Sequence, residues 1–591
     1  MKRNWNRKTD SGAVHAMGNG EIMVYGFGPE IIQVLASPIS ADNFCALDMP
    51  EVDFCVSERL DGTAIWKHTL GNGTVITDFV DIDVNCYQRY VVTEEACQML
   101  LRIDPIFSLI DEESDDNTLV FEAKSGVHFF VYTLDLCPRR YVKVSGAARI
   151  DKQEDGVYRL TFERGCGSLY VSDASASIEA EEAIPVERSI GRITAYWQDF
   201  LSQMKPFPKW LADICENVGI MIKSQQASDG SILAGYAYHL AYVRDQFGVA
   251  RGLLAMGFYR EVEKMMYFYK MYFDRYGKVC NAQSVGHHGV FHVHENDHVE
   301  ITGYLAILPF SVYDVNKSEQ FMQDMLPMIR WCIECQIREM RDGMLPFNGD
   351  ETYMAGGFLP RFAMYDGSAE ATMLLARSIE LYSIYTGDTQ YDGVLTEIKE
   401  TYLTNFIRNG RLMANIPERT PLSDYPAMRH GVCEDCGEVM AELTRNVHYR
   451  YVCDRCLTTH EPIPPRAFGS IELASSKLAP LYVGSELVPD GMMRVYLEEM
   501  VDAFHKDGQM PSGCPDGHAV GYDYGLFLYA LAKAGHPAAK EICDLTVSIL
   551  DETGVWCEYY QNGIPWKTRC RPWESAINIE GIIAFVEKTK G

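Results

Sequence analysis

The chain has 591 residues, of which 47% are hydrophobic and 23% are charged, and its formal net charge is −29. This length exceeds what one ordinary core accommodates, so we expect a soluble multidomain protein. The sequence contains no run of about 18 apolar residues, which excludes a membrane span, and its acidic balance argues against a nucleic-acid partner.

Residues 1–185 predict an N-terminal antiparallel β-sandwich. Short β-branched and aromatic stretches alternate there with turn residues such as those at 71–73, and many short strands at this spacing are typical of a sandwich. We expect strands at 21–25, 31–36, 74–80, 90–94, 99–103, 117–123, 126–133, 141–147, 156–162 and 168–172. The next segment, 186–206, predicts a linker helix.

Residues 207–591 predict an all-α domain, because apolar residues recur there at three- and four-residue spacing. We expect helices at 208–226, 245–256, 259–275, 297–313, 317–338, 367–386, 389–408, 469–483, 489–505, 519–534, 536–551 and 573–588. The joints near 257, 315, 387, 486 and 535 are short, and those at 227–244, 276–296, 339–366, 409–468, 506–518 and 552–572 are long. This alternation places all long joints at one end of an (α/α)6 toroid. Long joints in a compact domain are usually functional.

A zinc ribbon is predicted at 425–462, inside the longest joint. Cys433 and Cys436 form one pair and Cys453 and Cys456 form another, with sixteen residues between the pairs. Two such pairs deliver four thiolates to one tetrahedral zinc ion. Because four protein ligands leave no open position, we expect a structural ion. The alternative is four free or disulfide-linked cysteines.

The sixth long joint carries a carboxylate among aromatic residues. Glu558 lies close to Trp556 and Tyr559, and Trp573 follows before the last helix. Aromatic faces stack on the apolar faces of sugars, and a carboxylate beside them can take a proton from water. The alternative is a surface glutamate in an aromatic-rich loop.

The third long joint carries paired acids, Asp350 and Glu351, followed by Tyr353. Adjacent carboxylates raise each other's pKa, which helps to keep one of them protonated as a general acid. The alternative is a solvated turn or a helix N-cap.

The first long joint ends in Tyr242, Arg244 and Asp245, where a helix begins. Arg244 and Asp245 together can clamp neighbouring hydroxyls of a sugar, or Asp245 can simply cap the helix.

The second long joint is rich in histidines, including His287 and His288. Five histidines with acids suggest metal or phosphate, but they match no familiar ligand spacing. Neutral imidazoles also hydrogen-bond sugars, so we expect His287 and His288 to contact substrate.

These segments resemble the glucoamylase-like (α/α)6-barrel glycoside hydrolases of the family 15 type. The stretch Tyr242-Val-Arg-Asp-Gln-Phe-Gly is similar to the Arg-Asp signature of that family, although Val243 stands where the family has Trp. The acids at 350–351 stand where the family carries its general acid, and Glu558 with Pro572-Trp573-Glu-Ser-Ala resembles its general-base segment. Residues 18–38 resemble the start of its bacterial sandwich domain.

Together, the motifs and the resemblance imply an inverting glycoside hydrolase. Glu351 would protonate the leaving oxygen, with Asp350 as the alternative acid, and Glu558 would activate water as general base. Inversion requires the two carboxyl groups to lie about 6.5–9.5 Å apart, which facing joints can supply and adjacent residues cannot. Arg244 and Asp245 would hold the terminal sugar. A closed site favours exo action, and the acidic chain suits a neutral glycoside or oligosaccharide.

Two other functions remain open. A glycoside phosphorylase of the same architecture would need cations near Glu558, which Lys567, Arg569 and Arg571 or the histidines of 286–298 can supply. A non-catalytic sugar-binding protein would have the same toroid and bind sugar without cleaving it.

The remaining expectations concern cofactors, partners and location. We expect structural zinc and no organic cofactor. The partner is an oligosaccharide or glycoside, without nucleic acid or membrane, and a homo-oligomer is compatible with the sequence. The 18 scattered cysteines and a start without an apolar signal region predict a cytoplasmic protein with reduced thiols.

Overall fold

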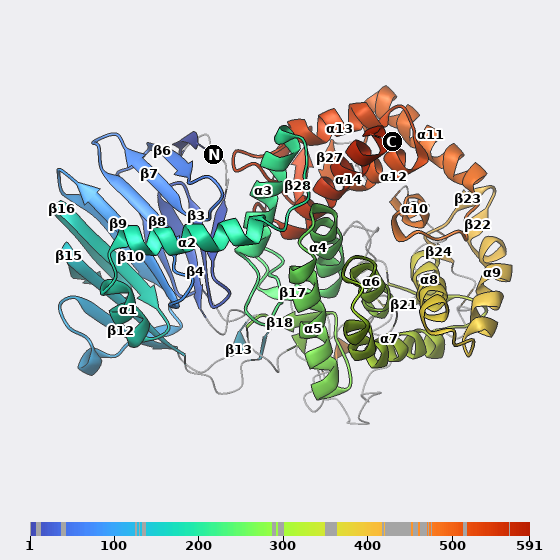
Figure 1. The fold of residues 1–591 in the computed structure, drawn as a ribbon, viewed down its shortest axis with the longest axis horizontal. Helices are drawn as coiled ribbons and strands as arrows, with labels where there is room; N and C mark the ends of the chain where they lie inside the picture. The colour runs from blue at the N-terminus through green and yellow to red at the C-terminus, as the bar shows by residue number, and fades with distance from the viewer. Residues whose placement is uncertain are drawn as a thin grey trace.

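The computed structural model describes residues 2–7, 14–36, 43–123, 127–128, 131–132, 138–286, 291–292, 299, 301–348, 363–416, 419, 451–452, 459–460, 470, 472–473, 475–511, 517–566 and 568–590. In Figure 1 a strand-rich part, coloured blue to teal, lies beside a ring of helices coloured green to red. Helix α2 (Val186–Leu201) runs along the strands toward the ring.

The strand-rich part is one antiparallel sheet that, within the described residues, contains fourteen strands. The strands are β1 (Lys2–Asn6), β2 (His15–Gly18), β3 (Ile22–Phe27), β4 (Glu30–Ala36), β5 (Cys45–Asp48), β6 (Phe54–Arg59), β7 (Trp66–Leu70), β8 (Val75–Val80), β9 (Cys86–Thr93), β10 (Cys97–Ile103), β11 (Phe107–Leu109), β12 (Thr118–Ala123), β15 (Arg139–Glu154) and β16 (Val157–Ser172). The main path of the sheet runs β1-β6-β7-β8-β9-β16-β10-β5-β4-β3-β2.

The long strand β16 joins two layers of this sheet. Its first half pairs with β10 and its second half pairs with β9, and β3 packs against β8 and β9 across the interior. Burial alternates along β10 from residue to residue, as expected for strands that cover a core on one face. The antiparallel N-terminal domain predicted from the sequence is therefore confirmed, as a single sheet folded over its own core.

Two helices connect the sheet to the ring. They are α1 (Ser175–Glu182) and α2, and the predicted linker helix corresponds to α2. Trp197 and Phe200 of α2 are buried. The ring of Phe200 stacks on that of Phe258 at 4.4 Å, so the linker is anchored on the helical ring by aromatic packing.

The ring contains twelve helices within the described residues. They are α3 (Lys209–Lys223), α4 (Val243–Met256), α5 (Tyr259–Tyr276), α6 (Ile301–Asn316), α7 (Glu319–Glu339), α8 (Ala369–Thr386), α9 (Asp392–Phe406), α10 (Ala479–Val483), α11 (Asp490–Asp507), α12 (Asp523–Ala534), α13 (Ala539–Ser548) and α14 (Pro572–Lys590). Each lies within one of the predicted helical segments or extends it by a few residues.

Six of these helices form a closed inner ring. Helix α4 contacts α6, α6 contacts α8, α8 contacts α10, α10 contacts α12, α12 contacts α14, and α14 contacts α4. The inner helices are buried on most sides, as α6 and α8 show, whereas the alternate helices cover them from outside. This is the predicted (α/α)6 toroid.

The long joints all precede inner helices, so they meet at one end of the toroid, which we call the long-joint end. Small antiparallel sheets connect them in pairs. The strands are β17 (Leu240–Tyr242), β18 (Ala282–Ser284) and β19 (Phe291–His292); β20 (Leu345–Asn348), β21 (Ala363–Ser368) and β24 (Asn415–Ile416); and β27 (His518–Val520), β28 (Tyr559–Gln561) and β29 (Ile564–Trp566).

No described helix has both the length and the apolar character that crossing a bilayer requires. The twelve described cysteines are free thiols, and all of them except Cys166 are buried. Packing therefore accounts for the eleven buried cysteines.

Candidate functional site

Glu558 lies at the long-joint end, immediately before β28, where its backbone is held on both sides. Its N–H donates to the carbonyl of Thr568 at 2.9 Å, and its carbonyl accepts from the N–H of Gly521 at 2.7 Å. A Cβ at position 521 would lie 1.8 Å from the carbonyl oxygen of Cys557. Only glycine at position 521 therefore lets the fifth joint come close enough to hydrogen-bond the backbone of Glu558.

The carboxylate of Glu558 has one described hydrogen-bond partner in the first long joint. The hydroxyl of Tyr238 lies 3.2 and 3.4 Å from its two oxygens. Burial, together with the negative charge of Glu558, raises the pKa of Tyr238 to about 12, so this phenol stays a donor. The side chain of Tyr238 is still 37% exposed, and Glu558 is half-buried. Solvent water therefore has access to a carboxylate whose orientation is fixed.

A buried cluster of charges lies behind this pair. The guanidinium of Arg571 donates to Glu574 at 3.0 and 3.2 Å and to the carbonyl of Ala234 at 2.6 Å, and it lies 3.5 Å from Asp245. Its Cζ is 4.8 Å from the centre of the Tyr238 ring. Arg571 therefore links three long-joint segments: the first joint, the start of α4 and the start of α14.

The protonation of this cluster is set by burial and by an excess of carboxylates. Burial and the charge of Glu558 together raise the pKa of Glu574 to about 7, against the opposing charge of Arg571. Burial alone lowers the pKa of Arg571, but the carboxylates of Glu574, Glu558 and Asp245 raise it well above its ordinary value. The charge of Arg571 is therefore shared among three acids, and near neutral pH Glu574 exchanges a proton close to Glu558.

Helix geometry explains why two of these acids tolerate burial. Asp245 is in the first turn of α4 and Glu574 is in the first turn of α14. Unpaired backbone N–H groups give a helix N-terminus a partial positive charge, which stabilises a carboxylate there. The N-cap of α4 is Tyr242 and not Asp245, so the alternative in which Asp245 caps this helix is wrong; Asp245 lies in the first turn and forms an ion pair with Arg571.

Arg244 and Trp573, two of the predicted substrate contacts, pack against each other. The Cζ of Arg244 lies 5.0 Å from the centre of the Trp573 ring, and its Nε lies 3.9 Å from Asp245. The Trp573 ring also stacks on Tyr522 at 4.5 Å. Trp573 is almost fully buried, so it offers little surface to a ligand and mainly fixes Arg244.

Trp556 was predicted to bind substrate, and this prediction is wrong. Its side chain is fully buried, and its indole N–H donates to the carbonyl of Thr546 at 2.8 Å. It therefore belongs to the core beneath the sixth joint. Tyr559 and Tyr242 are half-buried at the same end of the toroid, so both keep surface for a ligand.

Several predicted residues lie outside the described part of the chain. They are the acids Asp350 and Glu351, Tyr353, the histidines His287 and His288, and the zinc-ribbon cysteines Cys433, Cys436, Cys453 and Cys456. Among the residues that are described, no group of three or more side chains is arranged to hold a metal ion. The zinc ribbon therefore stays a prediction.

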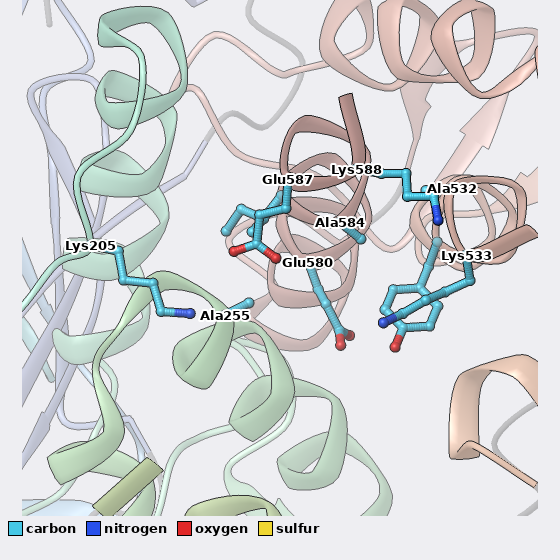
Figure 2. A pocket seen from close by; sticks show the side chains of 10 residues that line it. Lys205, Ala255, Ala532, Lys533, Glu580, Ala584, Glu587 and Lys588 are labelled. Atoms are coloured by element: carbon cyan, nitrogen blue, oxygen red, sulfur yellow. The ribbon is translucent and has the colours of Figure 1, made fainter. Parts of the chain in front are cut away.

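Two hollows of the described surface lie at the opposite end of the toroid, where the short joints are. One, of about 430 Å³, lies between the ends of α4, α12 and α14 and is lined by Lys205, Lys533, Glu580 and neighbouring residues (Figure 2). The other, of about 810 Å³, lies between α6, α7 and α8. Neither contains a predicted site residue, so neither is the candidate active site.

Two residues of this site, Tyr238 and Glu574, were not predicted from the sequence. Tyr238 is one of the aromatic residues of the first joint, and Glu574 follows Trp573 in the segment that opens the last helix. The available signal was local: a polar or acidic residue beside an aromatic one at the start of an inner helix.

Comparison with known proteins agrees with this architecture. No protein-family model and no curated protein sequence matches the chain. A bacterial glucoamylase complexed with acarbose superposes with a TM-score of 0.59 at 11% identity, over 100% of this chain and 95% of that one. A protein described as a kojibiose phosphorylase from the human microbiome superposes with a TM-score of 0.56 at 8% identity, over 99% and 88%. The chain shares their overall fold, so the predicted resemblance to glucoamylase-like proteins is confirmed for the fold.

Proposed function

We propose that this chain is an inverting glycoside hydrolase that acts on a neutral glycoside or oligosaccharide, with Glu558 as its general base. The observation that carries the proposal is the fixed, solvent-accessible carboxylate of Glu558 at the long-joint end of a glucoamylase-like toroid. A general base must be ionised, oriented and within reach of water. The backbone contacts of Glu558 and the phenol of Tyr238 supply the orientation, and the half-buried carboxylate is within reach of water.

The general acid of this proposal is Glu351, with Asp350 as the alternative. Both belong to the third long joint, which leads to the inner helix α8 at the same end of the toroid. An acid on one joint and a base on another leave room for the attacking water, as inversion requires. The bond between sugar carbon and leaving oxygen breaks as the acid donates its proton, and the water oxygen bonds to that carbon as Glu558 accepts its proton.

The buried cluster would hold the reacting sugar in place. Arg244 and Asp245 at the start of α4 are the proposed contacts to its hydroxyls, and Arg571 would fix the orientation of Asp245. The terminal sugar would occupy the centre of the long-joint end, which favours exo action. The net charge of −29 suits a neutral substrate.

A glycoside phosphorylase is the second candidate, and the fold shared with a protein described as a kojibiose phosphorylase favours it. Phosphate would then replace water as the nucleophile and would need cations near Glu558. The two described arginines of this joint are already engaged by acids, Arg571 by Asp245 and Glu574 and Arg569 by Glu552. Hydrolysis therefore remains the leading proposal.

Product analysis with and without phosphate tests the proposal. The purified protein is incubated with aryl glycosides and disaccharides of both anomeric forms, and the released sugar is followed by NMR. We expect release without phosphate, with inverted configuration at the anomeric carbon. Release that requires phosphate would assign the phosphorylase instead, and retained configuration would exclude the proposed roles of both acids.

The Glu558→Gln variant tests the proposed base directly. We expect kcat to fall by about 10²–10⁴-fold, which is the usual contribution of general base catalysis. Glu552→Gln is the matched control, because Glu552 is an exposed glutamate of the same joint. Equal activity of the Glu558→Gln variant and the native protein would contradict the assignment of Glu558 as the general base.

A further inference from the structure

The small sheet of β27, β28 and β29 has one inward face and one outward face. Its register pairs His518 with Gln561 and Tyr559 with Trp566. Side chains of a strand alternate between faces, so these four residues share one face of the sheet. Tyr560 and Ala519, which pair on the other face, are buried.

The outward face exposes large apolar side chains. Trp566 is 38% exposed and Ile564, two residues earlier on the same strand, is 67% exposed. The Trp566 ring lies 4.8 Å from the ring of His518 and 6.2 Å from that of Tyr559. Exposed apolar clusters of this kind mark interaction surfaces more often than isolated exposed residues do. We call His518, Tyr559 and Trp566 the aromatic platform.

The aromatic platform begins at the candidate active site and extends away from it. Tyr559 directly follows Glu558, and it is close enough to Tyr238 and Tyr522 to raise the pKa of each. Trp566 lies across the strand pair from Tyr559. The hairpin then turns at Asn562 and Gly563, where a Cβ on Gly563 would contact Ile549 at the end of α13. The hairpin that carries Tyr559 and Trp566 therefore follows directly after Glu558, and its turn lies beside the end of α13.

We propose that the aromatic platform binds the sugar units on the leaving-group side of the cleaved bond, so that the substrate is an oligosaccharide rather than a small aryl glycoside. This inference rests on the proposed function and names the substrate class of that site. A pyranose ring has an apolar face that stacks on an indole or phenol ring, and its hydroxyls hydrogen-bond to imidazole and amide groups. His518 and Gln561 supply such groups beside Trp566.

The two alternatives to a sugar fit this surface less well. A nucleic acid would need cations to offset phosphate, and the platform contains no lysine or arginine among its three residues. A purely apolar partner would cover the imidazole of His518 and the amide of Gln561 without offering either of them a hydrogen bond. A neutral ligand with both apolar faces and hydroxyls matches the whole set.

Binding measurements on the inactive protein test this proposal. Glu558→Gln protein is applied to an array of linear gluco-, manno- and galacto-oligosaccharides, in both anomeric linkages, from monosaccharide to hexasaccharide. The affinity for the retained oligosaccharides is then measured by calorimetry. Adding Trp566→Ala should weaken that affinity by about tenfold, because a stacked ring contributes on the order of one factor of ten. Trp566→Tyr, which keeps an aromatic face, should recover most of it.

The matched control is Trp210→Ala, because Trp210 is 45% exposed and lies in the first turn of the outer helix α3, outside the sheet that carries the platform. It should leave the affinity unchanged. Unchanged affinity after Trp566→Ala, or an array on which no oligosaccharide is retained, would overturn the platform. If Trp566-dependent binding occurs but the native protein cleaves nothing, the hydrolase and the leaving-group side of the platform are both contradicted, and only sugar binding by the platform is supported. If the native protein cleaves glycosides through Glu558 but Trp566→Ala leaves the affinity for oligosaccharides unchanged, the platform is contradicted and the hydrolase is supported.

Discussion

Tyr238 is the residue whose hydroxyl orients the proposed base, so its removal separates positioning from binding. Tyr238→Phe deletes the donor to both oxygens of Glu558 and keeps the ring over Arg571. We expect kcat to fall by about tenfold, since one hydrogen bond to a charged group contributes roughly 1.5–3 kcal/mol and water can replace part of it. KM should change little. Steady-state kinetics on the substrate found by product analysis gives both values.

Tyr267→Phe is the control for that measurement. Tyr267 is also 37% exposed, and its hydroxyl donates to a carboxylate, Asp324, at 3.0 Å. It joins the outer helices α5 and α7, far in the fold from the sixth joint. Equal losses of kcat in the two variants would show that a phenol–carboxylate bond acts through general stability, which contradicts the positioning assignment.

Some residues of the site could be predicted from their neighbours in the sequence, and others could not. Glu558 was identified because an acid among aromatic residues in a long joint is a pattern of neighbours. Its partner Tyr238 stands 320 positions earlier, so only the closed toroid brings the two together. Trp556 shows the opposite failure, because an aromatic residue in a joint has the same sequence signal whether its ring is buried or exposed.

At the scale of elements, α1 is attached to the sheet and to α2 through a buried acid whose charge depends on pH. Glu181 is buried, accepts from Ser189 at 2.6 Å and lies 3.4 Å from Arg192, which also binds Asp81 at 2.6 Å. Burial, with a smaller contribution from the charge of Asp81, raises the pKa of Glu181 from 4.5 to about 7, although Ser189 and Arg192 both act to lower it. The folded protein thus keeps a proton that the unfolded chain releases.

This linkage predicts a pH-dependent loss of stability. The contribution of Glu181 is fully present below pH 4.5, declines as pH rises toward 7, and is lost above that value. The shift corresponds to roughly 3 kcal/mol as an upper bound. Glu181→Gln stays neutral, so its free energy of unfolding should exceed that of the native protein at pH 8 and should fall less between pH 4.5 and 7.

Urea unfolding at a series of pH values measures this difference. Glu179→Gln is the control, because Glu179 is an exposed glutamate of the same helix. If Glu181→Gln follows the native pH profile, the acid is charged in the folded protein and the linkage is absent.

The helices of the ring were predicted more accurately from the sequence than the long strands of the sheet. The ring helices were predicted well because each inner helix contacts helices on both sides, which imposes a regular apolar spacing. Strand β15 was predicted as one shorter strand, 141–147, and β16 as two pieces, 156–162 and 168–172, although each strand continues for 16 residues. Gly146 and Gly165 interrupt the apolar pattern, and their positive φ angles of 73° and 125° mark irregular strand positions. Glycines that bend a strand and glycines that end it look alike in sequence.

At the scale of the whole molecule, the sheet and the toroid are joined by buried polar contacts as well as by the linker. Arg59 at the end of β6 donates to Glu216 at 3.0 Å and to Asn217 at 2.5 Å, both on α3. The hydroxyl of Tyr25 on β3 donates to Gln225 at 2.8 Å. Buried polar partners lose more when separated than exposed ones, because each is left without a hydrogen bond.

The two parts should therefore unfold together, and the joint that carries Tyr238 should depend on the sheet. Gln33 of β4 lies 3.4 Å from His239, the residue that follows Tyr238. The fold of the first joint could not be predicted from its own sequence for this reason. Its conformation is set partly by contacts with strands about 200 positions earlier in the chain, as the bond between Tyr25 and Gln225 illustrates.

Arg59→Ala tests whether the two parts unfold as one unit. The substitution removes a nearly buried guanidinium and leaves Glu216 and Asn217 without their donor, so we expect a loss of roughly 2–3 kcal/mol. Scanning calorimetry should show one transition for the native protein and one for the variant, and the transition of the variant should lie at lower temperature. Arg102→Ala is the control, because Arg102 pairs with Asp48 on the exposed surface of the sheet, where an ion pair contributes at most about 1 kcal/mol. Two separate transitions in the native protein, with only the earlier one moved by Arg59→Ala, would mean that the sheet unfolds without the toroid and cannot hold the first joint in place.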